Sequence, residues 1–277
     1  TTVRPPANPA SCRVGSEHPA AQLFPVNQAN RHLAVYDPQN GQLTHIGTCF
    51  STHHLMFAED ANNTLWTSGG GQVVGWLNRK MFDETGDEVR SQGWTALILD
   101  TNGNGKRDAY VEPDQPIDPT KDKRIQGGSY GVIPSPVDGS IWTAAPGVPG
   151  AIIRVNPGSD PTKTALAEIY EPPFNNPRSK VSAYLPRGID IDRNGVVWTA
   201  LAGSSHLASF DRRKCKVLSG PTATGQHCPE GWTLYLTPGP NFKGVTDESN
   251  ADMLYYNWVD QFDTLGLGRN TPIATGS

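Results

Sequence analysis

The residues most suited to metal chemistry lie in one short stretch, Asp100-Thr101-Asn102-Gly103-Asn104-Gly105-Lys106-Arg107-Asp108. Oxygen-bearing side chains stand at its positions 1, 3, 5 and 9, with glycine at position 6, which matches the first part of a calcium loop of the EF-hand type. Val111 replaces the glutamate of position 12, so the match stops there. A solvated Asn/Gly turn is the alternative. We expect four ligands to a structural Ca²⁺: Asp100, Asn102, Asn104 and Asp108.

Histidines are the second group that could do chemistry, because they serve as metal ligands and general bases near neutral pH. His53 and His54 are adjacent, so on a strand they would point to opposite faces. One of them could converge with His206 and with a carboxylate such as Glu59 or Asp190. His53, His54 and His206 are therefore candidate catalytic residues. The alternative is a histidine hydrogen-bonded to backbone carbonyls.

An aromatic run, Met253-Leu254-Tyr255-Tyr256-Asn257-Trp258, is followed by Phe262. It predicts either a plug packed on the fold or a platform for a ligand or protein. The sequence has no G-x-S-x-G elbow, P-loop, HExxH or Rossmann fingerprint, and no C-x-x-C-H for haem attachment.

Four cysteines form two local pairs in the sequence. They predict two disulfides, Cys12–Cys49 and Cys215–Cys228, although four cysteines allow three connectivities. Such bonds favour a periplasmic or secreted protein. The alternative is four buried free thiols. The spacing contains no C-x₂-C pair, which argues against zinc.

Composition narrows the class of protein. The 277 residues include 29 Gly and 24 Pro, which favours many short strands joined by tight turns. The net charge of −4 gives no electrostatic footprint for nucleic acid. No apolar run approaches the length of a membrane span.

A unit of strand, turn, strand, small-residue loop and strand occurs three times. The copies, aligned on Trp-Thr pairs, cover residues 53–78, 130–157 and 187–211, and candidate fourth strands follow at 94–99, 165–170 and 232–236. Recurring four-stranded units predict an all-β fold, a β-propeller of four-stranded antiparallel blades. A β-sandwich with coincidental Trp-Thr pairs is the alternative. The repeated tryptophan is expected to pack between blades.

Aligned in this way, His53-His54, Tyr130 and Arg187 occupy equivalent places just before an inner strand. Such residues would face the mouth of the central channel of a propeller. Tyr130 and Arg187 are therefore candidate ligand-binding residues.

The repeats also set the expected domain boundaries. Residues 1–30 predict an extended arm, and 31–277 a propeller domain with long insertions at about 79–128 and 238–269. Within the first insertion, residues 81–92 predict a short helix. Residues 31–47 predict a hairpin with an Asn-Gly turn, and 271–277 the beginning of a further unit. The chain stops in mid-blade, so we expect it to be part of a longer protein, truncated at its C-terminus; the alternative is a ring completed by another chain.

The Trp-Thr pairs follow an Asp/Asn/Gly turn and an aliphatic residue, with Arg187-Gly188-Ile189 before one copy and Ile152-Ile153-Arg154-Val155 after another. This pattern resembles the blade repeat of the virginiamycin B (streptogramin) lyase group of propellers. The resemblance implies seven blades when complete and an Mg²⁺-assisted elimination that uses a histidine base and a metal-bound acidic residue. No His/acid pair of this sequence matches, so the resemblance assigns no site residue.

Together these patterns predict an extracytoplasmic propeller that binds a small molecule or protein at its loop-rich channel mouth and carries structural Ca²⁺. One alternative is a metal-assisted lyase or hydrolase. Another is a subunit of a larger assembly that uses the insertions as contacts.

Overall fold

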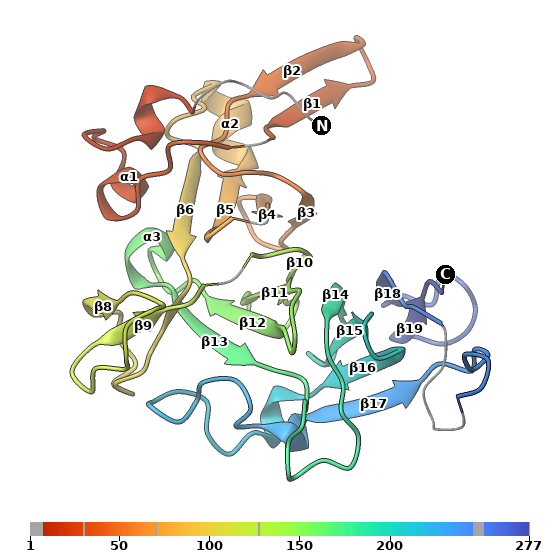
Figure 1. Cartoon of the computed structure of the whole chain (residues 1–277). Helices are drawn as coiled ribbons and strands as arrows, with labels where there is room; N and C mark the ends of the chain where they lie inside the picture. The colour runs from red at the N-terminus through yellow and green to blue at the C-terminus, as the bar shows by residue number, and fades with distance from the viewer. Residues whose placement is uncertain (1–7, 30, 70, 127, 246–251, 277) are drawn as a thin grey trace.

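Short antiparallel strands form most of the regular structure, in keeping with the density of glycine and proline. The computed structural model describes residues 8–29, 31–69, 71–126, 128–245 and 252–276. Residues 1–7 of the expected arm and 246–251 of the second expected insertion lie outside this part. Figure 1 shows three sheets that stand side by side, with a two-stranded hairpin before the first and another after the third.

Each sheet is built around one copy of the sequence repeat. The first contains β3 (His54–Phe57), β4 (Thr64–Ser68), β5 (Val73–Asn78) and β6 (Gln92–Ala96) in sequence order. The third contains β14 (Pro186–Ile191), β15 (Val197–Leu201), β16 (His206–Phe210) and β17 (Trp232–Leu236). Every neighbouring pair in these two sheets is antiparallel.

The second sheet has the same antiparallel core, β10 (Val132–Pro134), β11 (Ile141–Ala145), β12 (Ala151–Asn156) and β13 (Leu166–Tyr170). Three more strands extend its outer edge, β7 (Ile98–Leu99), β8 (Tyr110–Val111) and β9 (Asp122–Arg124), and β7 lies parallel to β13. We call the three antiparallel cores blades 1, 2 and 3.

The segment 79–128 is therefore more than a loop. It holds α2 (Arg79–Thr85), which is shorter than the helix predicted for 81–92 because Gly86 ends it in the left-handed region with φ 65°. The strand predicted at 94–99 is divided between β6 of blade 1 and β7 at the edge of the second sheet. The chain passes from one sheet to the next at Leu97. The alternation of apolar and polar residues does not predict such a crossing, because it is the same in either sheet.

The hairpins at either end also follow the sequence. β1 (Leu33–Asp37) pairs with β2 (Gln42–Ile46), and β18 (Asn257–Asp260) pairs with β19 (Thr271–Ala274). The remaining elements are single turns of helix: η1 (Ala10–Cys12), α1 (Pro19–Leu23), α3 (Pro161–Thr164), η2 (Arg212–Lys214) and η3 (Pro229–Gly231). The last two residues of the aromatic run predicted to be a plug or platform, Asn257 and Trp258, begin β18.

The first strands of consecutive units, β3, β10, β14 and β18, are neighbours in space, and the later strands of each blade lie farther out (Figure 1). This arrangement is propeller-like. Within the described part of the chain, the sheets form an arc with a hairpin at each end.

The repeated tryptophans hold neighbouring sheets together. Trp66 lies in a buried cluster with Val132 and Ile141 of blade 2, and Trp142 in a cluster with Ile189 and Val197 of blade 3. Tryptophans bury large apolar areas, so these contacts are a main source of cohesion between sheets. The expected packing of these two tryptophans between blades is confirmed.

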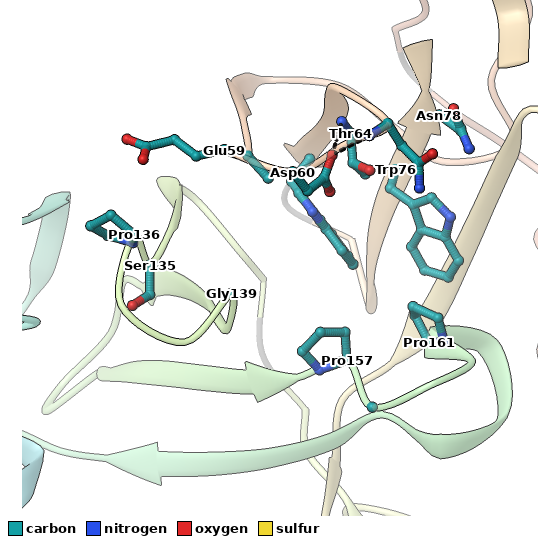
Figure 2. Close-up of a pocket in the computed structure, with 14 residues that line it drawn as sticks. Glu59, Asp60, Thr64, Trp76, Asn78, Ser135, Pro136, Gly139, Pro157 and Pro161 are labelled. Carbon is teal, nitrogen blue, oxygen red and sulfur yellow. Dashed lines mark hydrogen bonds between the residues drawn. The ribbon is translucent and has the colours of Figure 1, made fainter. Parts of the chain in front are cut away.

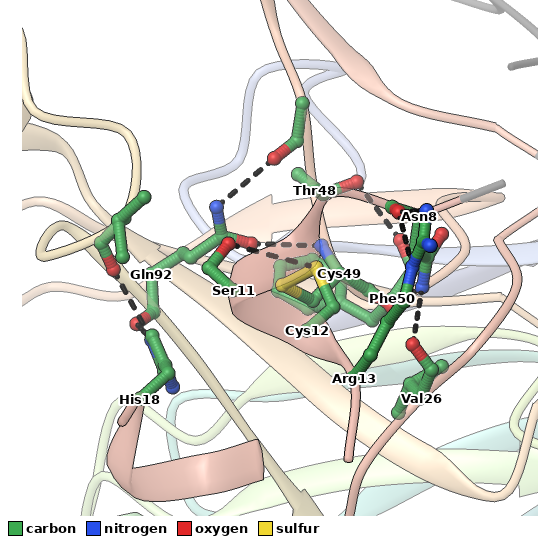
Figure 3. The surroundings of a disulfide bond; sticks show 12 residues. Asn8, Ser11, Cys12, Arg13, His18, Val26, Thr48, Cys49, Phe50 and Gln92 are labelled. Carbon is green, nitrogen blue, oxygen red and sulfur yellow. Dashed lines mark hydrogen bonds between the residues drawn. A yellow bond between two sulfur atoms is a disulfide. The ribbon is translucent and has the colours of Figure 1, made fainter. Parts of the chain in front are cut away.

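Both predicted disulfides are present, Cys12–Cys49 and Cys215–Cys228, and the chain has no free cysteine. Figure 3 shows how the first attaches the N-terminal segment to blade 1. Gln92 of β6 accepts a hydrogen bond from the Cys49 amide at 2.8 Å, and the Asn8 amide donates to the Cys49 carbonyl at 2.7 Å. Two such bonds indicate folding in an oxidising environment.

The described helices are all short, and none of them could cross a bilayer.

Candidate functional site

Six polar and aromatic residues from four separate sheets meet where the inner strands begin. Each precedes or starts an inner strand: β3, β10, β14 or β18. Hydrogen bonds and ring contacts join them into one group. We call this group the mouth cluster: His53, His54, Tyr130, Arg187, Tyr255 and Tyr256.

The repeat itself positions two members of the cluster. The threonine of each Trp-Thr pair in blades 2 and 3 donates to a glycine carbonyl on the inner strand, Thr143 to Gly131 at 2.6 Å and Thr199 to Gly188 at 2.7 Å. These glycines directly follow Tyr130 and Arg187. A buried hydroxyl–carbonyl bond fixes the backbone at that point. The repeat threonines of blades 2 and 3 thus support the backbone next to Tyr130 and Arg187.

Glycine at position 188 is also needed for close packing. A Cβ there would lie 2.7 Å from the backbone nitrogen of Asn257 and 2.7 Å from the Cα of Tyr256. The Gly188 amide donates to the Tyr255 carbonyl at 3.2 Å. Only glycine allows the hairpin of β18 and β19 to approach blade 3 this closely, which brings both tyrosines to the cluster.

Arg187 is the centre of the cluster. Its guanidinium carbon lies 4.0 Å from the ring centre of Tyr255 and 4.8 Å from that of Tyr130, and Nη2 donates to the Tyr255 hydroxyl at 2.6 Å. Burial lowers the pKa of Arg187, but hydrogen bonding to Tyr130 and the nearby tyrosines raise it above its ordinary value. Cation–π contact on two rings holds the guanidinium in one orientation.

The two histidines are joined edge to edge. His54 Nδ1 lies 2.7 Å from both the Tyr130 carbonyl oxygen and His53 Nδ1. A carbonyl only accepts, so His54 Nδ1 carries the proton and donates. In neutral His54 the lone pair is then on Nε2. Burial lowers the pKa of both histidines, and for His53 the positive charges of His54, Arg31 and Arg187 lower the pKa further.

The mouth cluster therefore combines one permanent cation with phenol and imidazole groups. The charged groups that act on His53 are all basic. The carboxylates considered from the sequence are engaged elsewhere: Glu59 pairs with Arg193, and Asp190 Oδ2 accepts from the Val259 amide at 2.7 Å. Mg²⁺ is usually bound by protein carboxylates, and none of the six cluster residues has one, so the cluster does not fit this metal.

His206 does not join the mouth cluster through any of the contacts that unite it. His206 is the first residue of β16 and pairs with Leu201 of β15. Leu201 in turn pairs with Pro186 of β14, so His206 lies two strands outward from the inner strand. Its side chain is buried, a backbone hydrogen bond joins it to Ser204, and Nδ1 has no hydrogen-bond partner in the part of the chain that the structure describes. Strand order within blade 3 thus places two strands between His206 and the inner edge of the blade, and its convergence with His53 or His54 stays a prediction.

The four predicted calcium ligands surround a single turn after β7. Asp100 Oδ1 accepts from the amides of Gly103 and Asn104, and Oδ2 from that of Gly105. The Asn102 and Asn104 amides donate to Asp108 at 2.9 and 2.7 Å, and these bonds lower the pKa of the Asp108 carboxyl.

A buried carboxylate lies beside this turn. Asp122 of β9 is inaccessible to solvent, its Oδ2 accepts from the Asp108 amide at 2.7 Å, and its Oδ1 has no hydrogen-bond partner among the described residues. Burial raises the pKa of Asp122. Among the described residues, no three His, Cys, Asp or Glu side chains are grouped in a way that could hold a metal. Any ion in the loop would need asparagine and backbone oxygens in addition to the carboxylates.

Tyr255 and Tyr256 are the cluster members that the sequence did not single out as site residues. The available signal was their place in the aromatic run just before a strand. Their part in the cluster depends on contacts with Arg187, 68 residues from Tyr255, and with Tyr130, 126 residues from Tyr256. No local sequence pattern contains such contacts.

The sequence matches no family model, and no curated protein shows a significant match. Among solved structures, the chain is similar to a streptogramin B lyase, with a TM-score of 0.39 and 12% identity over 82% of this chain and 66% of that one. It is also similar to virginiamycin B lyase from Staphylococcus aureus, with a TM-score of 0.35 and 12% identity over 82% and 68%.

A third similar structure is PorZ, an essential surface component of the type-IX secretion system of Porphyromonas gingivalis. The TM-score is 0.42 and the identity 13%, over 82% of this chain and 26% of that one. The chain spans about two thirds of the length of the lyases and about a quarter of PorZ. These similarities are distant and say nothing about the activity of this chain. The propeller-like description is based on the arrangement of its own sheets.

Proposed function

We propose that the protein is an extracytoplasmic, propeller-like binding protein whose mouth cluster holds a ligand that carries an anionic group. The observation that supports this most directly is the fixed guanidinium of Arg187 between Tyr130 and Tyr255. A guanidinium presents its donors in a rigid plane that matches carboxylate or phosphate. A cation already held in place loses little conformational entropy when it binds an anion.

The groups around Arg187 support the same ligand class. Phenol hydroxyls of Tyr130, Tyr255 and Tyr256 form a connected set of hydrogen bonds beside it. His53 is exposed and can reach a ligand from the open side. The tyrosine rings also offer a flat apolar surface, so an anion attached to an aromatic ring suits the cluster best.

Benzoate is a suitable probe, because it combines a carboxylate with a flat ring. Its binding can be followed by the ring ¹H–¹³C NMR signals of His53 and His54. We expect saturable shifts in the wild type and at least tenfold weaker binding in Arg187→Gln. Affinity should rise as pH falls through the lowered pKa values of the two histidines, since each protonation adds positive charge near the carboxylate.

Arg193→Gln is the matched control. Arg193 lies on the turn after β14, pairs with Glu59 and is outside the mouth cluster, so this variant should bind benzoate like the wild type. Benzylamine has the same ring with the opposite charge. Equal shifts with benzylamine, or unchanged benzoate affinity in Arg187→Gln, would contradict the proposal.

We also propose that the loop from Asp100 to Asp108 binds a structural Ca²⁺. Its oxygen-bearing side chains gather around one turn, and calcium favours several such ligands. Binding to the folded state alone would stabilise it by about 2.7 kcal/mol at a Ca²⁺ concentration of about 100 times Kd. We expect Ca²⁺ to raise Tm more than Mg²⁺ does, and EDTA to reverse the increase.

The increment in Tm caused by Ca²⁺, rather than Tm itself, is the measurement to compare between variants. Asp100→Asn should reduce that increment strongly. Asp114→Asn changes an exposed carboxyl of the same insertion outside the loop and should keep it. An increment that is the same in both variants would show that Ca²⁺ acts elsewhere.

A further inference from the structure

A pocket of about 370 Å³ lies between blades 1 and 2, at the ends of the inner strands remote from the mouth cluster. Its residues follow β3 and β10, whereas the cluster residues precede or begin those strands. Blade 1 contributes the turn after β3 and two tryptophans, and blade 2 contributes the β10–β11 turn and the loop from β12 to α3 (Figure 2).

Two tryptophans form the apolar side of the pocket. The rings of Trp66 and Trp76 are 5.2 Å apart and tilted by 46°. Trp66 is only 5% exposed and belongs to the core shared by the two blades, so it cannot move freely. Trp76 lies against Gly93, where a Cβ would approach an indole carbon to 2.4 Å. Figure 2 shows Pro157 and Pro161 across the cavity from Trp76.

The polar side consists of groups that hydrogen-bond without a positive charge. Asp60 Oδ1 accepts from the amides of Asn62 and Thr64, each at 3.0 Å, which fixes its carboxylate at the pocket wall. Asn78 Oδ1 accepts from the Met81 amide at 2.9 Å, so its NH₂ is directed elsewhere as a donor. No lysine, arginine or histidine lines the pocket, all of whose lining residues are described.

We propose that this pocket binds a neutral sugar of one or two pyranose rings. Such a ring has an apolar C–H face that can stack on an indole and a rim of hydroxyls that can bond carboxylate and amide groups. An anionic ligand would meet Asp60 with no compensating cation. A purely apolar ligand would bury the remaining hydrogen-bonding capacity of the Asp60 carboxylate and the Asn78 NH₂ without offering a partner, which is costly. The size is within the range of small-molecule sites.

A proline-rich peptide is the strongest competing ligand, since such segments dock on aromatic grooves. It would use the tryptophans but make no use of the carboxylate and amide groups at the pocket wall. The proposal is independent of the mouth cluster, which lies at the other end of the inner strands.

The test is isothermal titration calorimetry of the full chain with three neutral disaccharides, cellobiose, maltose and N,N′-diacetylchitobiose, and with decaproline. We expect saturable binding of at least one disaccharide with a Kd below 10 mM, at least tenfold weaker in Trp76→Ala and severalfold weaker in Asn62→Ala. Asn62 is exposed on a turn, so the Asn62 variant should fold even if the Trp76 variant does not. Circular dichroism confirms folding of each variant.

Trp258→Ala removes a tryptophan that is 51% exposed on β18, away from the pocket, and should bind as the wild type does. The proposal is overturned if no disaccharide binds at 50 mM ligand, or if decaproline binds and the sugars do not. It is also overturned if the Trp76 and Asn62 variants bind the sugar as tightly as the Trp258 variant.

Discussion

Asp190 should make the protein less stable as pH rises from acid to neutral. It lies on β14 and joins blade 3 to the hairpin of β18 and β19, with Oδ2 accepting from the Val259 amide at 2.7 Å and Oδ1 from the Ile191 amide at 2.8 Å. Burial raises the pKa of its carboxyl to about 6, although both amides lower it. Desolvation therefore outweighs the two hydrogen bonds.

The direction of the effect follows from proton binding. The folded state holds the Asp190 proton up to about pH 6, whereas an unfolded chain releases it near its ordinary pKa of 3.8. Stability from this group is thus greatest below the lower value and is lost as pH rises to the upper one. Each pH unit between the two values corresponds to about 1.36 kcal/mol, which gives a loss of about 3 kcal/mol across the window.

Urea unfolding of the wild type and Asp190→Asn at several pH values between 3.5 and 8 measures this loss. The variant cannot titrate at this position but keeps an acceptor for one of the amides. We expect the wild type to lose about 3 kcal/mol relative to the variant between about pH 4 and pH 6.5. A flat difference, or a wild type that gains relative stability as pH rises, would refute the assignment of burial as the dominant cause.

Asp138→Asn is the opposing control. Burial raises the pKa of Asp138, but hydrogen bonds from Ser140 and Arg154 lower it well below its ordinary value. Its contribution to stability is therefore present above pH 4 and lost as pH falls below that value. The two difference curves should slope in opposite directions.

Three further predictions concern stability. Cys12→Ser opens a loop of 37 residues and should cost about 3.8 kcal/mol of unfolding free energy, whereas Cys215→Ser opens a loop of 13 residues and should cost about 2.9 kcal/mol. Urea unfolding measures both costs, and equal values would contradict the dependence on loop length. Gly93→Ala should cost about 1–3 kcal/mol and alter the Trp76 fluorescence, because its Cβ would overlap the indole; an unchanged Tm and spectrum would show that the ring can move aside. Arg154→Met should cost about 1–3 kcal/mol and Arg154→Lys less, since methionine leaves Asp138 without its cation while Glu168 keeps Arg212; calorimetric Tm values that are equal for both variants would argue against a charge effect.

Four residues of the mouth cluster could be predicted from the sequence repeat. Alignment on Trp-Thr pairs placed His53, His54, Tyr130 and Arg187 in equivalent positions, and the structure brings these four together because equivalent positions on neighbouring inner strands lie side by side. The threonine of the repeat also supports the backbone next to Tyr130 and Arg187. The roles of these residues in binding stay predictions.

The amino-acid sequence by itself determined the features that depend on short stretches. Alternation and turn residues are local, so the three blades, the hairpin of β1 and β2 and the two closely spaced cysteine pairs could be predicted. Tertiary structure alone decided which separate segments touch. The parallel addition of β7 to β13, the outward place of His206 and the approach of Tyr255 to Arg187 all depend on packing between sheets. Such contacts join residues tens of positions apart, where side-chain period and turn chemistry carry no information.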